Sequence, residues 1–280
     1  MHIHKVLFLY YMEVKGKIDT YNMEERTSLI EAARGVMDHA GISTFLSDIL
    51  SCVDELIKNS VKANYKFILI REYIMDKICE DFPQLPKEEQ LDLFREMAFT
   101  RISFDTMAVE FMQGSDISSA VRQVLNEEGR YMRILNRAYR ENRDLTDEEQ
   151  EELKQLEGFH SIRKKLKEHN INIFYKVQVI EDFLYFEITN TAPMLTMDLR
   201  RIHDKRSEFK QYHSEGREQD FFINNIDTSD SGHGLGYAKI DSFLYHLGLE
   251  PEESAAIISS IDTTVMLILP LKHLQVDDTH

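Results

Sequence analysis

The stretch VDELIKNSVKAN (residues 53–64) decides how the rest of the chain is interpreted. It lies late in a segment whose apolar residues, from Ile42 to Val61, recur every three or four positions, which predicts a helix with one buried face. On this helix Glu55 and Asn59 are four residues apart, with Lys62 three residues further on, so a carboxylate, an amide and an ammonium group line up together. A carboxylate and an amide oxygen are suitable ligands for Mg2+, and a lysine is suitable for a phosphate.

The composition and charge of the chain restrict its class. Its 280 residues are 42% hydrophobic and 29% charged, which is typical of a soluble globular protein with one large or two modest domains. The net charge of −16 repels a nucleic-acid backbone, so we expect no nucleic-acid partner. No segment approaches the ~20 apolar residues of a membrane span, and the N-terminus lacks the full pattern of a signal peptide. These features predict a cytoplasmic protein with no membrane span. Cys52 and Cys79 are predicted to be buried free thiols, which fit a reducing compartment.

Helical patterns dominate the first 169 residues. A strand is expected at 5–12, and capping boxes at Asn22 with Glu25 and at Thr146 with Glu149 mark two helix starts. The predicted helices are 23–39, a helix that opens at Ser43 or Thr44 and can run on through Ile70, 87–99, 117–142 and 146–169.

From Asn170 the period of the apolar residues changes to that of a strand. Alternation on both sides of Glu181 and Asp182 predicts a β-hairpin with one buried face. Residues 195–231 are polar, which is typical of a lid or a mobile binding loop. The sequence then predicts a glycine-rich loop at 232–236, a helix at 237–247 and a last buried strand at 265–270.

The glycine-rich loop GHGLG (residues 232–236) is the most specific functional signal among these elements. Glycines at alternate positions let a backbone approach a polyphosphate, and the helix that follows offers free amide groups. A glycine-rich helix start without a ligand is the alternative. A dinucleotide-binding loop is not expected, because the polar residues before the loop do not resemble the strand that such a loop follows.

Read together, these stretches resemble the ATPase domain shared by sensor histidine kinases, gyrase B, MutL and the anti-sigma kinases, the GHKL superfamily. Residues 55–63 resemble its N-box, 188–194 a strand ending in its first glycine box, 232–236 its second glycine box, and Thr263 with Thr264 the start of its closing strand. The resemblance implies an α/β (α+β) two-layer sandwich, the Bergerat fold, with helices on one face of a mixed, mostly antiparallel sheet. The domain organisation expected is 1–65 as the first part of the ATPase domain, 66–169 as a helical insertion, and 170–280 as the remainder.

The resemblance also implies ATP and Mg2+ as cofactors and assigns roles within the N-box. In the family the glutamate orients or activates water or supports the metal, the asparagine binds Mg2+, and the lysine approaches the phosphates, which implies these roles for Glu55, Asn59 and Lys62. Asp54 and Asn64 are expected to be bystanders. The nucleotide-binding positions implied by the family's motifs are Asn59, Lys62, Ala63, Asn190, Ala192, Met194, Gly232, His233, Gly234, Leu235, Gly236 and Thr264.

Two features depart from the family pattern. The first glycine box usually reads Asp-x-Gly-x-Gly, whereas this chain has NTAPM at 190–194. An asparagine oxygen can still accept a hydrogen bond from adenine, at a loss of about 1 kcal/mol. The chain also lacks the family's phosphoacceptor histidine motif before the N-box, so a conventional autophosphorylating sensor kinase is not expected. Basic residues of the predicted lid could reach phosphates or form a solvated patch: Arg200, Arg201, Lys205 and Arg206.

The function expected is that of a Mg-ATP-binding, histidine-kinase-like signalling protein of a two-component system. It would hydrolyse ATP or transfer the phosphoryl group to a partner protein. The alternative is a catalytically degenerate regulator that sequesters a transcription factor or response regulator, and a fold that binds no nucleotide is a third. The insertion at 66–169 is expected to bind a protein partner or form a homodimer, although its helices could also only extend the core.

Overall fold

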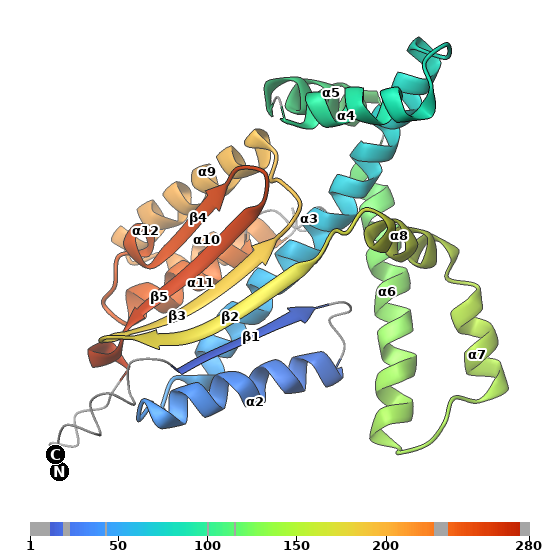
Figure 1. Cartoon of the computed structure of the whole chain (residues 1–280). Coiled ribbons are helices and arrows are strands. Elements are labelled where there is room, and N and C mark those ends of the chain that lie inside the picture. Colours follow the sequence, from blue (N-terminus) through green and yellow to red (C-terminus); the bar gives the residue numbers. More distant parts are fainter. Residues whose placement is uncertain are drawn as a thin grey trace, which may run out of the picture. The chain divides into compact units, whose positions relative to one another are not determined.

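The structure is a computed structural model that describes residues 12–18, 23–42, 44–99, 101–114, 116–226 and 235–274 (Figure 1). The chain divides into two compact units. The first, which we call the sheet unit, comprises residues 1–60, 172–191 and 199–280. The second, which we call the helical unit, comprises residues 61–171 and 192–198. Apart from Met12, the strand expected at 5–12 lies outside the described residues, as does the cap at Asn22.

An open five-stranded antiparallel sheet forms the centre of the sheet unit, in the order β1-β2-β3-β5-β4. Every pairing within it is antiparallel, so the prediction of a mixed sheet is wrong for the described strands. The predicted hairpin and last strand are confirmed, and the hairpin turns at Glu181, which has a positive φ of 51°. The strands are β1 (Met12–Ile18), β2 (Ile173–Ile180), β3 (Phe183–Asn190), β4 (Ala255–Ser259) and β5 (Thr263–Pro270).

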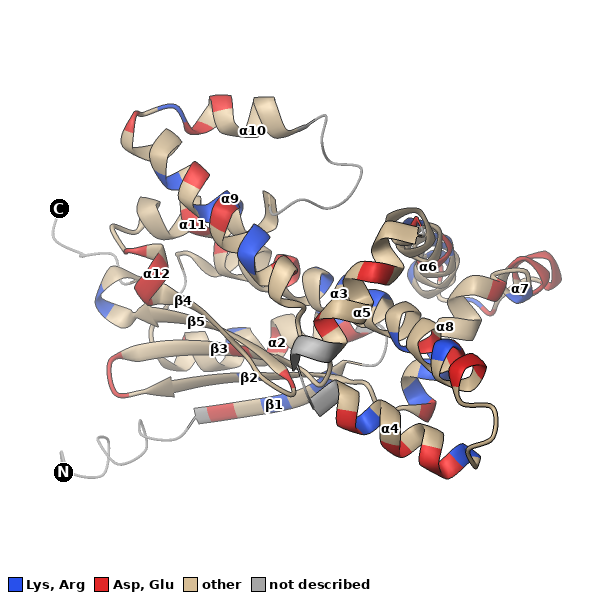
Figure 2. Ribbon diagram, turned by 90° about the horizontal axis from the view of Figure 1, so that it is seen from above, with Lys and Arg blue, Asp and Glu red and all other residues tan. Residues whose placement is uncertain are grey.

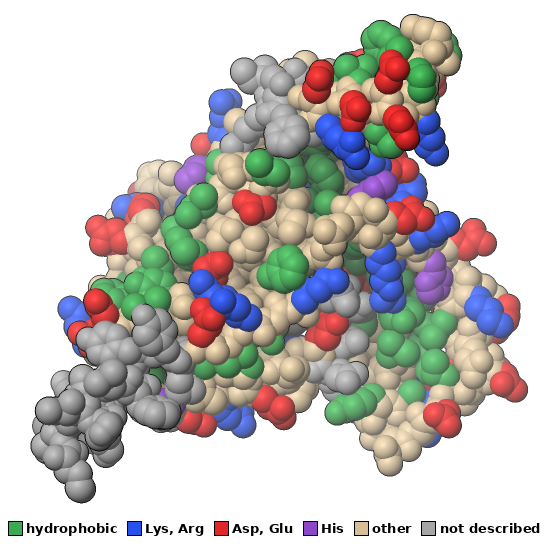
Figure 3. Space-filling model, viewed as in Figure 1, with side chains coloured by type: hydrophobic (Ala, Val, Ile, Leu, Met, Phe, Trp, Pro, Cys, Tyr) green, Lys and Arg blue, Asp and Glu red, His purple; other side chains and the backbone are tan. Residues whose placement is uncertain are grey.

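One face of this sheet is buried under helices, as the alternating pattern predicts. On β3 every second side chain, including those of Leu184, Phe186 and Ile188, is buried. Figures 1 and 2 show helices on that side, among them α3 and α11. Phe174 and Ile258 point to the other face, where they are 41% and 54% exposed, and Figure 3 shows that side with hydrophobic and charged side chains intermixed. The helices of this unit are α2 (Met23–His39), the first part of α3 (Leu46–Asp81), most of α9 (Thr196–Ser214), α10 (Glu218–Ile226), α11 (Leu235–His246), α12 (Pro251–Ser254) and the short 3-10 helix η2 (Leu271–His273).

The polar segment 195–231 is not the loop that its composition predicts. It forms α9 and α10 up to residue 226, and the last residues of the segment lie outside the described ranges. Phe209 of α9 and Phe221 of α10 are fully buried together, with ring centroids 5.1 Å apart, against Ala238 of α11. A few buried aromatic side chains thus hold two otherwise polar helices, because each large apolar side chain removed from water contributes about 1.5–3 kcal/mol.

The helical unit is organised around the second part of α3. One apolar cluster includes Ile74, Phe94 and Phe104, and a second includes Tyr65 and Phe159. The prediction that α3 runs on through residue 70 is confirmed, although the helix begins at Leu46 rather than at residue 43 or 44, and it ends before Pro83. The other helices of this unit are α4 (Lys87–Phe99), α5 (Arg101–Gly114), α6 (Ile117–Arg140), α7 (Asp147–Lys154) and α8 (Glu157–Glu168).

The single helix predicted at 146–169 is wrong, because the chain breaks between α7 and α8. Leu156 at the break is 1% exposed, so the interruption turns this side chain into the core. The start of α8 has no side-chain cap of its own, and the carboxylate of Glu127 on α6 accepts a hydrogen bond from the Phe159 amide at 2.8 Å. A contact from a distant helix therefore provides the start signal that the local sequence lacks.

Two further predictions concern the cysteines and the membrane. Both cysteines are free, as predicted, but only Cys52 is buried, and Cys79 is exposed, which corrects the expectation for that residue.

Among the described residues, no helix has the length and apolar character needed to span a bilayer.

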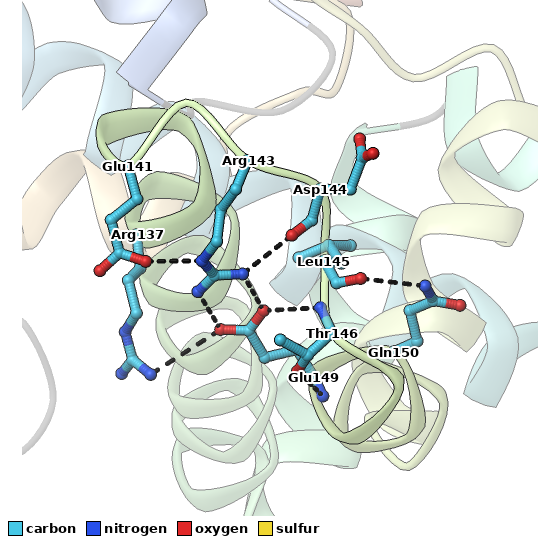
Figure 4. A network of polar contacts seen from close by, with 8 residues as sticks. All are labelled: Arg137, Glu141, Arg143, Asp144, Leu145, Thr146, Glu149 and Gln150. Atoms are coloured by element: carbon cyan, nitrogen blue, oxygen red, sulfur yellow. Dashed lines mark hydrogen bonds and ion pairs between the residues drawn. The ribbon is translucent and has the colours of Figure 1, made fainter.

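The connection between α6 and α7 is held by a polar network centred on Glu149 (Figure 4). The predicted capping box is confirmed, since Thr146 accepts a hydrogen bond from the Glu149 amide and the Glu149 side chain accepts one from the Thr146 amide. Two hydrogen bonds from Arg143, of 2.7 and 2.8 Å, then hold the carboxylate. The Arg143 guanidinium is the main cause that lowers the pKa of Glu149 from 4.5 to about 2. The contribution of Glu149 to stability is therefore present above pH 4.5 and is lost as the pH falls toward about 2.

Replacing Thr146 by alanine should destabilise α7 by about 1 kcal/mol, because the first turn of the helix loses its cap. Amide hydrogen exchange at residues 147–154 should then become roughly fivefold faster at neutral pH. The exposed Ser161→Ala substitution on α8 is the matched control and should leave these rates unchanged. Unaltered exchange in the Thr146→Ala variant would show that the cap does not stabilise α7.

Candidate functional site

The structure brings Glu55 and Asn59 of α3 against the start of α11. A Cβ atom added to Gly236 would lie 2.9 Å from Glu55 Oε2 and 3.2 Å from Asn59 Nδ2. Both distances are shorter than ordinary van der Waals contact, so a glycine is what lets the α11 backbone come this close. Residues from two motifs far apart in the sequence therefore meet in the sheet unit.

Charged side chains of both signs surround this contact. Asp54 is paired with Lys58 at 2.6 Å and with Arg26 at 3.1 Å, which gives it a structural role consistent with a bystander. Glu55 Oε1 lies 3.5 Å from the ammonium group of Lys239 and 3.9 Å from that of Lys58. The Glu55 carboxylate is thus placed between two lysines and the α11 backbone.

Cys52 is buried one helical turn before Glu55, and its thiol is unreactive. Burial, followed by the negative charges of Asp48, Glu55 and Asp241, raises the pKa of its thiol to about 12. The thiol stays protonated at neutral pH, so Cys52 is not a nucleophile.

A buried ion pair connects α9 to α11. The Arg206 guanidinium donates to both carboxylate oxygens of Asp241, with Nε–Oδ2 and Nη2–Oδ1 distances of 2.9 Å, and also to the carbonyl oxygens of Pro251 and Ala255. Arg206 is therefore neither a phosphate ligand from a lid nor part of a solvated patch, because all its strong contacts lie inside the sheet unit. Lys205 pairs with Glu208, whereas Arg200 and Arg201 are exposed on α9.

Asn190 lies at the end of β3 and contacts α3. Its Nδ2 donates to the carbonyl oxygen of Ser60 at 3.4 Å, and its side chain is buried. In the sheet register Asn190 is opposite Thr263, which is also buried. Thr264 points to the other face of the sheet, where its hydroxyl lies 2.9 Å from that of Thr189. The structure thus places Thr263, rather than the expected Thr264, beside Asn190.

The remaining expected site residues, apart from Leu235, are either outside the described residues or in the helical unit. Gly232, His233 and Gly234 lie outside the described residues, and Leu235 is the first residue of α11. Asn64 is buried, and its Oδ1 has no hydrogen-bond partner among the described residues. Four of the expected nucleotide-binding residues belong to the helical unit: Lys62, Ala63, Ala192 and Met194.

The side chains around Gly236 include an amide oxygen and a carboxylate that could contribute ligands to a magnesium ion. Among the described residues, no group of three His, Cys, Asp or Glu side chains could hold a metal ion. Asn59 and Glu55 offer an amide oxygen and a carboxylate one helical turn apart. Mg2+ prefers oxygen ligands and is usually bound by one or two protein groups together with water and phosphate oxygens, so these residues fit such an ion.

Sequence reasoning missed Lys239 and Asp241, which both lie on α11. Lys239 is three residues after Gly236, so helical spacing alone places the two residues on one face. Asp241 had no comparable signal, because its partner Arg206 lies in the segment expected to be a loop.

The comparisons with known proteins returned no relative. The chain matches no protein-family model, no curated protein and no solved structure.

Proposed function

We propose that the sheet unit binds Mg-ATP in a site of the histidine-kinase-like (GHKL) type. The observation that supports this proposal most strongly is the approach of Gly236 to Glu55 and Asn59, since it joins the residues that resemble the N-box to those that resemble the second glycine box. The helices on one face of the antiparallel sheet agree with a Bergerat-type two-layer sandwich, which we propose as the fold.

In this proposal three of the described residues would have distinct roles in binding and catalysis. Asn59 would hold Mg2+ through its amide oxygen, and the ion would neutralise charge on the phosphates. Glu55 would orient the attacking group and accept its proton, as a general base does. Gly236 allows the α11 backbone to approach, and the first amide groups of that helix would face the phosphates.

The chain would act as a cytoplasmic signalling protein. It would hydrolyse ATP or transfer the phosphoryl group to a partner protein, such as a response regulator or a transcription regulator. The helical unit is the proposed surface for that partner or for a second copy of the chain. The net charge of −16 disfavours nucleic acid as a partner.

Titration of the purified protein with a fluorescent ATP analogue, with and without Mg2+, tests the proposal. We expect saturable binding that requires Mg2+, and an increase in Kd of at least tenfold, or about 1.4 kcal/mol, in the Asn59→Ala variant, because the metal loses its amide ligand. The control is Asn224→Ala, an exposed position on α10, which should bind like the wild type. Absence of binding by the wild type at millimolar nucleotide would refute the proposal.

A second candidate is a regulator that keeps the fold and lacks turnover. The observation in its favour is the segment after β3, which has no glycine. The Thr191 amide donates a hydrogen bond of 3.0 Å to the Asn172 carbonyl oxygen, and the Asn172 amide donates one of 2.8 Å to the Thr191 hydroxyl, so this segment is tied to the start of β2. Phosphate release from ATP separates the two functions. Release by the wild type above the rate of the Asn59→Ala variant supports the enzyme, and binding without release supports the regulator.

A further inference from the structure

Lys239 lies beside Glu55 on the same face of α11 as Gly236. Its Nζ is 3.5 Å from Glu55 Oε1, whereas the Cβ position of Gly236 is 2.9 Å from Glu55 Oε2. The two oxygens of one carboxylate therefore meet residues that are three positions apart on one helix. The Lys239 side chain is 58% exposed, so its ammonium group is accessible from solvent.

The other lysine that pairs with Glu55, Lys58, is less suited to bind a ligand. Lys58 is closer to Asp54, at 2.6 Å, than to Glu55, at 3.9 Å, and Asp54 also contacts Arg26. Lys58 is thus part of a structural group of ion pairs.

A polyphosphate beside Glu55 would bring further negative charge, so a positive side chain close to that carboxylate favours its binding. Asp48 and Glu55 bring negative charge to this part of α3, whereas Asp241 on α11 is paired with Arg206. The ion pair of Lys239 with Glu55 is 3.5 Å long and its lysine is 58% exposed, so we expect that exchanging it costs little. Phosphate oxygens are strong acceptors for an ammonium group, and they can replace the carboxylate.

We propose that Lys239 is a phosphate-binding residue of this site, and that its ammonium group exchanges the Glu55 carboxylate for a phosphate oxygen when a nucleotide binds. This inference rests on the proposed binding of Mg-ATP. It assigns to α11 the cationic role that the resemblance assigns to Lys62.

Binding titrations with ATP, ADP and AMP test the assignment. We expect the Lys239→Met variant to raise the Kd for Mg-ATP at least tenfold, and to have a smaller effect on AMP, because fewer phosphate oxygens remain to be bound. Lys239→Arg should stay within about threefold of the wild type, since it keeps the charge. The matched control is Lys58→Met, which removes the other lysine near Glu55 and should also stay within about threefold, since that lysine pairs mainly with Asp54.

A chemical footprint provides a readout that does not depend on turnover. Lysine acetylation followed by mass spectrometry should show slower modification of Lys239 in the presence of Mg-ATP or inorganic triphosphate, with no change at Lys58. Equal protection of both lysines, or of neither, would overturn the assignment.

The outcomes separate this inference from the proposed function. If the wild type binds no nucleotide, both fail. If the wild type binds Mg-ATP and Lys239→Met binds it equally well, the proposed function stands and the role of Lys239 is refuted.

Discussion

Replacing Gly236 by alanine should weaken Mg-ATP binding at least tenfold while changing the free energy of unfolding by no more than about 1 kcal/mol. The added methyl group would lie 2.9 Å from Glu55 Oε2, a distance that no real contact of this kind maintains. Because that oxygen is the end of a flexible side chain, Glu55 can move aside and the fold survives. Its displaced carboxylate and the crowded Asn59 amide would no longer be placed for a magnesium nucleotide. Nucleotide titration and urea denaturation measure the two effects separately.

The matched control for this variant is Gly35→Ala. Gly35 lies inside α2, and an added Cβ atom meets nothing within 4 Å. This substitution should raise the free energy of unfolding by about 0.5–1 kcal/mol, since alanine is the better helix former, and leave binding unchanged. Equal nucleotide affinity in the Gly236→Ala variant and the wild type would show that the contact of Gly236 with α3 plays no part in binding.

Replacing Arg206 by methionine should cost the sheet unit about 3–5 kcal/mol, the loss typical of removing one partner from a buried ion pair. Asp241 is 2% exposed, so its carboxyl group would be left buried without its cation. The carbonyl oxygens of Pro251 and Ala255 would also lose a donor. The midpoint of urea denaturation, followed by circular dichroism, measures this loss.

A second substitution separates the buried charge from the contacts of the guanidinium. Adding Asp241→Leu to Arg206→Met should restore much of the stability, because no unpaired charge then remains. The exposed Lys210, which pairs with Glu252 at 2.9 Å, gives the control Lys210→Met, expected to change stability by no more than about 1 kcal/mol. If Arg206→Met is no more destabilising than Lys210→Met, the buried pair does not stabilise the unit.

The sequence predicted those helices and strands whose buried face is marked by a regular spacing of apolar residues within the element itself. The bounds of α2 and α4, and the position of the hairpin β2–β3, follow from local patterns and turn residues. It could not predict α9 and α10, because only a few buried side chains, such as Phe209 and Phe221, hold these polar helices to the rest of the unit. The break before α8 depends on Glu127 from another helix, which no local pattern contains.

Some residues of the candidate site could likewise be predicted from local spacing, whereas others could not. Glu55 and Asn59 share a helix face by spacing alone, and the structure places them at Gly236 as the order of the motifs suggests. The choice between Thr263 and Thr264 needed the strand register, since adjacent residues of a strand point to opposite faces. Lys239 could not be identified as a neighbour of Glu55 from the sequence, because this depends on the packing of α11 against α3.

The course of α3 limits how this protein can be dissected. The chain passes between the two units four times, and two of these crossings lie inside helices: one between Ser60 and Val61, within the continuous 36-residue α3, and one between Asp198 and Leu199, within α9. Proteases prefer exposed loops, so neither of these crossings offers a natural cleavage point. A deletion that isolates one unit must cut through two helices and expose their buried faces. Point substitutions in the intact chain are therefore the sounder way to assign the separate roles of its parts.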